Sequence, residues 1–377
     1  MMRFLLSVAT LVGTIVGVGM FGLPAVTAEA GWLSIAVIAL IVLPLVVITH
    51  LAYAHVVVLT SSRARLPGYA GLWLGKPAKY VAFVSQALGL VGSSLAYLMV
   101  GGSFLAQFIS SVLPIPFWAG VAIFFLAGAV LVWRGTKSIA RAELVMVGIM
   151  LCAIVVLGIA ALPSFRSANL AAIPFTGAPW RAYGVLIFSL WGMSVIPEVA
   201  EVSSRRNLGE VVAGGVILSF LASALFVLIA LGVSDGAISA DALSSLSMHL
   251  GKGVRLFGFG FGVLATFTSY LTLTRVTVDM LRYDFRIGTV VSFISATVIP
   301  LILLLMGFND FITVLAITGA VSLGIEGILV MMIEEHAVRE RPQQKIFHMP
   351  SFVRNTVILL LCIGISLELL ATIGVLK

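Results

Sequence analysis

The sequence predicts an all-α protein that crosses a membrane many times and is built from two inverted halves. Two observations support this prediction. Of the 377 residues, 61% are hydrophobic and only 10% are charged, with a mean hydropathy of +1.19, whereas a soluble protein of this length needs more charge to cover its surface. Apolar runs of about 20 residues, the length that spans a bilayer, recur along the chain, and two of them carry the same helix-breaking motif.

Eleven apolar segments are predicted to span the membrane, and they divide into five, five and one. The first five form one repeat over residues 4–162, the next five form a second repeat over residues 182–333, and residues 353–376 form an extra helix. Because five is odd, the second repeat is upside down relative to the first, which is the plan of many secondary transporters. Residues 1–377 are therefore expected to form one transmembrane transporter domain. The predicted spans are 4–27, 32–59, 80–110, 117–133, 139–162, 182–202, 211–233, 254–278, 288–306, 311–333 and 353–376.

The basic residues are distributed unequally between the two sides of the membrane. With a cytoplasmic N-terminus, 17 of the 22 Lys and Arg residues lie on the cytoplasmic side and 5 on the other. This asymmetry obeys the positive-inside rule, so it predicts a multi-pass protein of the cell inner membrane. The net charge of +7 reflects topology, and no nucleic acid partner is expected. Cys152 and Cys362 fall in mid-span, and we expect neither a disulfide nor a metal site.

The repeated motif lies at the head of each repeat. Residues Gly19–Pro24 read GMFGLP and residues Gly192–Pro197 read GMSVIP, and both Gly and Pro disfavour a helix interior. In a bilayer, unwound backbone is tolerated only where it faces protein or a water-filled cavity. Half-helix N-termini favour a carboxylate there and free carbonyls favour an ammonium, so the two motifs predict an amino acid site at mid-membrane. The alternative is a pair of kinked helices whose small residues serve close packing.

Longer stretches around these motifs resemble a known family. GTIVGVGMFGLP in the first span, and GVLIFSLWGMSVIPEVAE followed by RRNLGEVV around the sixth, are similar to segments of the aromatic amino acid (tryptophan/tyrosine) permeases, which belong to the amino acid–polyamine–organocation superfamily. LPGYAGLWLG, AYLMVGGSFL and TSYLTLTRVTVDMLRYDF extend the similarity over nearly the whole chain. The resemblance implies a leucine-transporter-like fold, which is a 5+5 inverted-repeat helix bundle with spans 1 and 6 unwound, here followed by an eleventh helix.

The resemblance also implies a substrate site at the two unwound turns. Backbone N–H groups of the first turn would bind the α-carboxylate, carbonyls of the second would bind the α-ammonium, and an aromatic side chain would cover the pocket. Independently, Tyr97 in the third span is a candidate for the pocket wall. The residues that match these roles are Gly17, Val18 and Gly19 with Thr14 beside them, then Phe188, Ser189 and Leu190, and finally Trp191 as the aromatic wall beside Gly192.

The sequence is compatible with either of two coupling ions, H⁺ or Na⁺. Thr268 and Ser269 are adjacent in the eighth span and match the paired hydroxyls that complete a cation site in sodium-coupled relatives. Proton-coupled relatives can carry a lysine in the fifth span, and residues 139–162 contain none. The tryptophan/tyrosine permeases themselves are thought to be proton-coupled, so both H⁺ and Na⁺ stay as alternatives.

Three glutamates within the spans are further candidates for coupling or gating. A charged residue at mid-bilayer costs roughly 2.5–3.5 kcal/mol on insertion scales, so each needs a reason. Glu198 and Glu201 are three residues apart and share one face of the sixth span, and Glu326 lies near the middle of the tenth. The structural alternative for the first two is ion pairing, of Glu201 with Arg205 at i+4 or of Glu198 with a neighbouring span. His50 and His55, five apart in the second span, are expected to serve packing or to lie at the membrane interface.

Together these features predict a secondary transporter that moves amino acids, aromatic or otherwise hydrophobic, by alternating access driven by a proton or sodium gradient. The alternative is a membrane amino acid sensor with the same fold. An enzyme is not expected, because the chain has no HExxH, GxSxG or nucleotide-binding P-loop segment. The expected partners are an amino acid and the lipid bilayer, with no cofactor besides the coupling ion and a monomer or weak homo-oligomer as the assembly.

Overall fold

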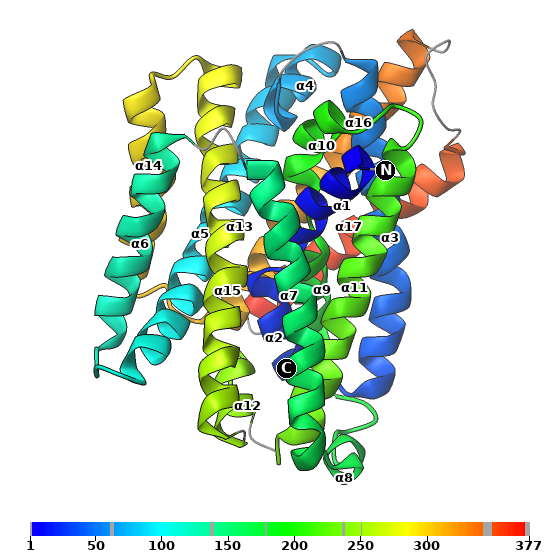
Figure 1. Ribbon diagram of the computed structural model, residues 1–377. Helices are drawn as coiled ribbons and strands as arrows, with labels where there is room; N and C mark the ends of the chain where they lie inside the picture. The colour runs from blue at the N-terminus through cyan, green and yellow to red at the C-terminus, as the bar shows by residue number, and fades with distance from the viewer. Residues whose placement is uncertain are drawn as a thin grey trace.

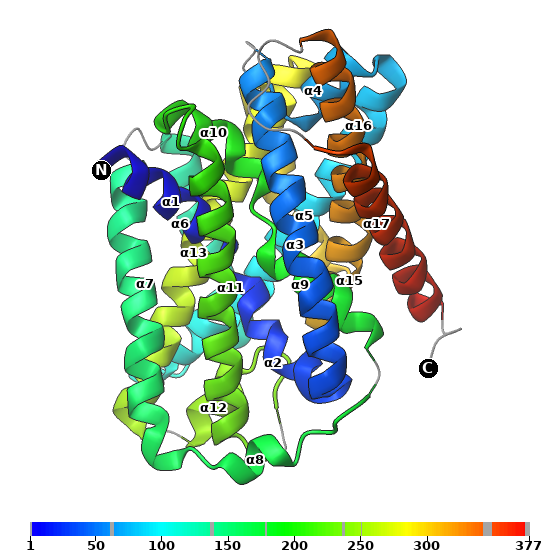
Figure 2. The ribbon, with the colours of Figure 1, turned by 90° about the vertical axis from the view of Figure 1, so that its right-hand side faces the viewer.

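A computed structural model describes residues 2–60, 64–135, 139–177, 179–235, 238–249, 251–341 and 349–373, and regular secondary structure within these ranges is helical (Figure 1). The helices form one bundle. α4 (Leu66–Trp73) and α10 (Ile196–Val202) lie at one end of it, and α8 (Ser167–Ala171) and α12 (Leu243–His249) lie at the other (Figure 2). We call these ends the α4 face and the α12 face.

The remaining helices follow the chain order in two sets. The first set is α1 (Met2–Ile15), α2 (Val18–Ala30), α3 (Trp32–Leu59), α5 (Lys76–Ser110), α6 (Phe117–Arg134) and α7 (Ile139–Ala161). The second set is α9 (Trp180–Leu190), α11 (Leu208–Val233), α13 (Lys252–Phe285), α14 (Thr289–Leu305), α15 (Phe311–Ile317), α16 (Gly324–Glu340) and α17 (Ser351–Thr372).

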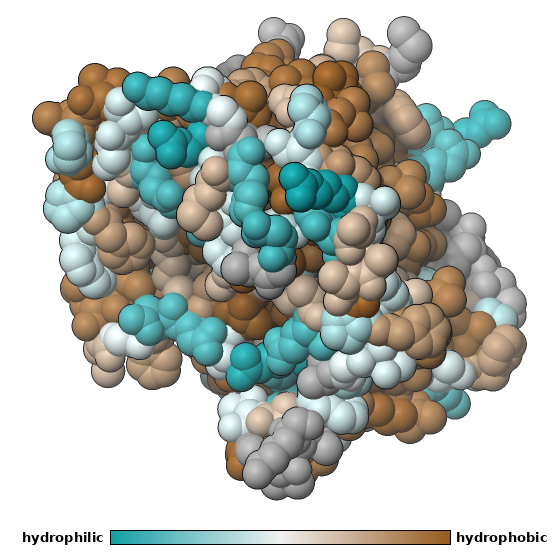
Figure 3. Space-filling model, turned by 90° about the horizontal axis from the view of Figure 1, so that it is seen from below, coloured by the Kyte–Doolittle hydropathy of each residue, from teal (hydrophilic) through white to brown (hydrophobic). Residues whose placement is uncertain are grey.

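The helices account for the predicted spans. Within the described ranges, nine helical segments are long and apolar enough to cross a membrane, and one of these combines α9 with α10. The bent pair α1–α2 provides a tenth crossing, and the shorter apolar helix α14 occupies the predicted ninth span. Figure 3 views the molecule from the α12 face, where hydrophilic side chains gather toward the middle and hydrophobic ones make up much of the margin.

Several helices extend beyond the spans that the sequence predicts. α5 begins at Lys76 instead of residue 80, α13 extends to Phe285 instead of residue 278, and α16 extends to Glu340 instead of residue 333. An apolar run marks the part of a helix that lies in hydrocarbon, whereas the backbone ladder continues into water beside charged residues such as Arg282. Hydropathy therefore locates the crossing and underestimates the helix.

The first crossing is broken between α1 and α2, which meet at an angle of 51°. The Gly17 N–H donates to the Ile15 carbonyl at 2.9 Å, so it does not continue the regular ladder. A Cβ at Gly17 would lie 2.5 Å from the Tyr97 hydroxyl, and only glycine allows so close an approach. Pro24 lies inside α2, downstream of the break.

The sixth crossing is broken between α9 and α10. The α-helix ends at Leu190, a single 3₁₀ turn covers Met193–Val195, and α10 begins at Ile196. Pro197 stands in the first turn of α10, where its missing N–H removes no intrahelical hydrogen bond. The predicted unwinding of spans 1 and 6 is confirmed, and both breaks lie upstream of their prolines. Pro24 is inside α2, whereas Pro197 is in the first turn of α10.

Candidate functional site

The two breaks lie against each other within the bundle. A Cβ at Gly19 would come within 2.6 Å of the Ser189 Cα and 2.9 Å of the Phe188 ring, so the start of α2 touches the end of α9. The N-terminus of α2 carries partial positive charge from its free N–H groups, and the C-terminus of α9 carries partial negative charge from its free carbonyls. Two opposite helix poles are therefore presented side by side.

A small cavity adjoins these helix ends. Its volume is about 30 Å³, which on the usual measure has room for about two water molecules. An amino acid is larger, so the surrounding side chains must move before one can bind. The cavity is lined by Thr14, Ile15, Gly19, Gly89, Leu90, Ser93, Tyr97, Phe188, Trp191, Ser194, Leu273, Leu323 and Glu326.

The predicted residues divide between the cavity wall and the layer behind it. Thr14, Gly19, Tyr97, Phe188, Trp191 and Glu326 line the cavity. Gly17, Val18, Ser189, Leu190 and Gly192 do not line it but form the adjoining breaks and helix ends.

Sequence reasoning missed several residues of the wall. Gly89, Ser93 and Tyr97 are spaced by four along α5 and so share one face of that helix; this spacing of two small residues before a tyrosine is a signal that the sequence carried. Leu273 and Leu323 had no such signal, because Leu is common throughout the apolar segments of the chain. The approach of Leu323 also depends on a π-helical turn at Thr318–Leu323, which shifts the helical register before α16.

Glu326 and Trp191 form one polar corner of the cavity, which is also lined by the hydroxyl-bearing residues Thr14, Ser93, Tyr97 and Ser194. The Glu326 residue is 2% exposed, and its carboxylate accepts a hydrogen bond from the Trp191 indole Nε1 at 3.4 Å. Leu90, Phe188 and Leu323 supply apolar lining. The arrangement suits a substrate with a hydrophobic side chain and places one ionisable group at its edge.

Tyr97 and Ser269 stabilise the break in the first crossing. The Tyr97 hydroxyl is hydrogen-bonded to the Ser269 side chain and to the Val18 backbone. The Ser269 hydroxyl donates to the Gly13 carbonyl at 2.9 Å, which replaces the helical partner that the break removed. Thr268 points to a different place, a cavity of about 10 Å³ between α1, α7 and α13 that Gly13 also lines. The Thr268 hydroxyl donates to the Ala265 carbonyl at 3.2 Å, so of the two hydroxyls the one on Ser269 contacts the Gly13 carbonyl.

Glu198 and Glu201 lie away from this cavity, in a larger one of about 430 Å³ at the α4 face. Arg65, just before α4, places its Nη2 2.5 Å from Glu198 Oε1 and 3.6 Å from Asp279 Oδ2 of α13. Pairing of Glu198 with a neighbouring span was the structural alternative to a coupling or gating role, and the partner in the structure is Arg65 of the loop before α4. Tyr69 lies beside them, and burial raises the pKa of its phenol to about 12, so it stays neutral.

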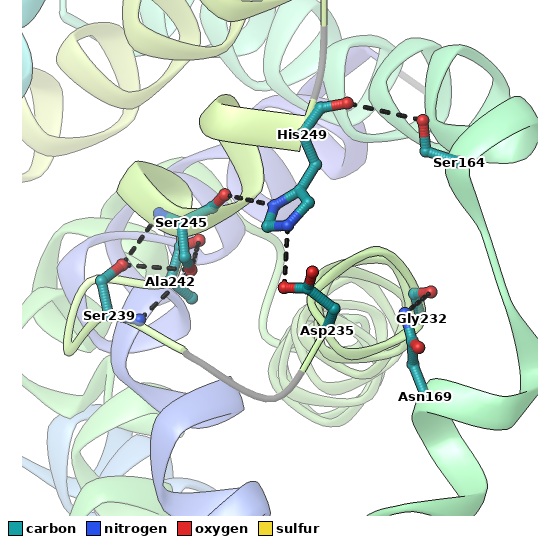
Figure 4. Close-up of polar contacts among 8 residues, drawn as sticks. All are labelled: Ser164, Asn169, Gly232, Asp235, Ser239, Ala242, Ser245 and His249. Atoms are coloured by element: carbon teal, nitrogen blue, oxygen red, sulfur yellow. Dashed lines mark hydrogen bonds and ion pairs between the residues drawn. The ribbon is translucent and has the colours of Figure 1, made fainter.

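A polar cluster holds α12 over the opposite face (Figure 4). The two ring nitrogens of His249 lie 3.0 Å from Asp235 Oδ1 and 3.0 Å from the Ser245 carbonyl, so both contacts are hydrogen bonds when the imidazole carries two protons. The hydrogen bond from His249 lowers the pKa of the Asp235 carboxyl. Nearby, the Asn169 side chain donates to the Gly232 carbonyl at 3.0 Å, which joins α8 to the end of α11.

Two broken helices that meet beside a small cavity, within a bundle of membrane-crossing helices, define a transporter of the discontinuous-helix class. Among the described residues no group of three or more His, Cys, Asp or Glu side chains is placed to hold a metal ion. A sequence model of the tryptophan/tyrosine permease family matches residues 1–371, and the chain belongs to that family.

Comparison with solved structures supports the fold. The crystal structure of MhsT in complex with L-phenylalanine is similar, with a TM-score of 0.74 and 17% sequence identity over 97% of this chain and 98% of that chain. A search of curated proteins finds no match. The predicted leucine-transporter-like fold is confirmed, and the protein is an amino acid transporter and not an enzyme. Nothing in these comparisons favours the sensor alternative.

Proposed function

We propose that the protein transports hydrophobic amino acids, aromatic ones included, and binds them where α2 and α9 meet. The contact between the two broken helices carries this proposal. The N–H groups at the start of α2, from Gly17 to Gly19, would receive the α-carboxylate, and the carbonyls at the end of α9, from Phe188 to Leu190, the α-ammonium. The apolar lining would receive the side chain, with Trp191 as its aromatic wall.

For the coupling ion, the geometry supports two sets of residues. Thr268, Ser269 and the Gly13 carbonyl offer oxygen atoms around the first break, the chemistry that a small cation needs. Glu326 offers a protonatable group on the substrate cavity itself. Of the two, the proposal favours a proton carried by Glu326, because its protonation and substrate binding share one cavity. Glu198 and Glu201 are proposed as gating residues, since they line the α4-face cavity.

The charge distribution supports an orientation. Because most Lys and Arg residues fall in segments at the α4 side, we infer that the α4 face is cytoplasmic and the α12 face external. The larger cavity would then be a vestibule toward the cytoplasm, in the inner membrane, and a single chain is sufficient to form the site.

The test is uptake into proteoliposomes. Labelled L-tryptophan, L-tyrosine and L-phenylalanine are expected to accumulate when a pH gradient is imposed, with or without sodium, whereas L-glutamate and L-lysine are not. Accumulation that needs sodium and ignores the pH gradient would move the coupling site to Thr268 and Ser269. Binding of these amino acids without flux under either gradient would contradict the transport mechanism.

A matched pair of variants tests the cavity. Ser93 lines the cavity and Ser366 is exposed on α17, and each hydroxyl donates to a carbonyl four residues earlier in its own helix, at 2.8 and 2.9 Å. Ser93→Val adds bulk to the cavity and should abolish ligand-induced thermal stabilisation, while Ser366→Val should preserve it. Equal stabilisation in both variants would place the substrate elsewhere. Gly19 is less suitable, because any side chain there collides with the backbone of α9.

A further inference from the structure

His50, on α3, is fully buried against the break of the sixth crossing. Its Nε2 lies 2.9 Å from the backbone nitrogen of Gly192, and its Nδ1 lies 2.8 Å from the Val46 carbonyl oxygen. A carbonyl can only accept, so Nδ1 carries the proton; an N–H can only donate, so Nε2 presents its lone pair. The two partners together select the neutral imidazole with the proton on Nδ1.

The hydrogen bond from Gly192 to His50 replaces a helical hydrogen bond that the break removes. In a continuous helix the Gly192 N–H would donate to the Phe188 carbonyl, but the Trp191 N–H donates there at 3.3 Å instead. The N–H of Gly192 is buried, and a buried N–H without a partner is strongly unfavourable. His50 supplies the acceptor from another helix, so the position of the turn depends on α3.

The same ring also contacts the wall of the substrate cavity. The rings of His50 and Trp191 pack edge to face, with centroids 5.2 Å apart and an interplanar angle of 79°. The Trp191 indole in turn donates to Glu326. One side chain therefore holds both the backbone of the turn and the aromatic group that covers the cavity.

We propose that His50 is a positioning residue of the substrate site: its neutral imidazole fixes the Trp191–Gly192 turn, and through it the orientation of Trp191 and of the carbonyls at the end of α9. This inference rests on the proposed substrate site. It assigns His50 a role that the sequence alone, which suggested packing, did not indicate.

His55 shows that the position of the ring on α3 decides its role. Five residues further along α3, the Nδ1 of His55 lies 3.1 Å from Glu334 Oε1, and Arg354 lies 2.9 Å from the other carboxylate oxygen. That cluster joins α3, α16 and α17 at a distance from the breaks. His55 thus holds helices together, whereas His50 holds a turn.

The experiment compares three variants on α3 by substrate titration and transport kinetics. His50→Leu keeps the bulk and removes the acceptor, and it should raise both Kd and KM for the amino acid about tenfold or more. His50→Gln can place its side-chain oxygen near the former Nε2 and should restore Kd to within about threefold of the parent value. Thr49→Val, which removes a buried hydroxyl that donates to the Leu45 carbonyl in its own helix, should change Kd by less than about twofold.

A spectroscopic measurement on the unmodified protein keeps the test independent of folding. With ¹⁵N-labelled histidine, the His50 signals should show a protonated Nδ1 and an unprotonated Nε2. A protonated Nε2, an unchanged Kd in His50→Leu, or no recovery in His50→Gln would each overturn the positioning role. A different result would contradict the proposed function: the parent protein itself would bind no amino acid, whatever the protonation of the His50 ring.

Discussion

The ion pair between Arg65 and Glu198 leads to a quantitative prediction about opening at the α4 face. Arg65 lies just before α4, Glu198 is on α10 and Asp279 is on α13, so the guanidinium joins three segments across the 430 Å³ cavity. We expect Glu198→Gln to weaken this junction and to increase the population of the conformation that is open at the α4 face.

The magnitude follows from the exposure of the two partners. The Arg65 side chain is 8% exposed and the Glu198 side chain 37%. Exposed pairs contribute about 0.2–1 kcal/mol, and removing one partner of a fully buried pair costs about 3–5 kcal/mol. This pair lies between those limits, and Asp279 continues to neutralise Arg65 after the change. An effect of about 1–2 kcal/mol is therefore expected, which corresponds to about a 5- to 30-fold shift in the opening equilibrium.

The assay measures the accessibility of a cysteine in the cavity. Ala200→Cys places a thiol on the cavity lining, in a background where Cys152 and Cys362 are replaced by serine. A charged thiol reagent should modify it about 5 to 30 times faster when Glu198→Gln is added. Glu210→Gln removes the same charge from an exposed position at the start of α11 and serves as the control. A modification rate within twofold of the parent in Glu198→Gln would refute the gating role.

Three further predictions concern the site and its cover. Tyr97→Phe removes the hydroxyl that bonds to the first break, and a loss of about 1 kcal/mol should raise Kd for the amino acid about fivefold in a binding titration; an unchanged Kd would argue against this contact. Glu326→Gln keeps the size of the side chain and removes its proton site, so exchange across the membrane should persist while accumulation driven by a pH gradient is lost. Retained accumulation would exclude Glu326 as the carrier. Because the pKa of Asp235 is lowered in the folded protein by its hydrogen bond from His249, the stabilisation is present above the ordinary carboxyl pKa of about 3.9 and is lost as the pH falls below it. Hydrogen exchange in α12 should accelerate in that acid range, and Asp235→Asn should remove this acid step.

The sequence predicted the crossings and the breaks because both depend on local properties. Hydropathy reports which segments are long and apolar enough to cross, and a proline that follows a glycine-rich run reports where the ladder is weak. Pro24 and Pro197 therefore located the unwound turns to within a few residues. The resemblance of the same segments to a permease family then identified the residues that surround the turns.

The partners of the breaks were not predictable from the sequence, because they come from distant positions in the chain. His50 meets Gly192 across 142 residues and Ser269 meets Gly13 across 256. A buried histidine in an apolar helix has the same sequence pattern whether it fills space or accepts a hydrogen bond, and packing was the expectation here. Arg65 was similarly counted only as a basic loop residue, since nothing local indicates that it reaches α10 and α13.

The packing of the helices divides these contacts into two kinds. α1, α2, α3, α9, α10 and α11 pack among themselves, and α5, α6, α13 and α14 form a second group with extensive mutual contacts. The proposed substrate cavity lies between the groups: Thr14 and Trp191 come from the first, and Ser93 and Leu273 from the second. Alternating access requires the two groups to move relative to each other around this cavity.

Contacts that cross the boundary must then change during transport, and contacts within a group need not. Ser269 to Gly13 crosses from α13 to α1, Tyr97 to Val18 crosses from α5 to α2, and Arg65 links Glu198 of the first group to Asp279 of the second. The bond from His50 to Gly192 stays within the first group. It follows that Ser269→Ala should change the rate of cysteine modification in the α4-face cavity, whereas His50→Leu should change affinity and leave that rate within twofold of the parent. If His50→Leu instead altered accessibility as strongly as Ser269→Ala, the division into two moving groups would be wrong, because a contact internal to one group would then control the opening.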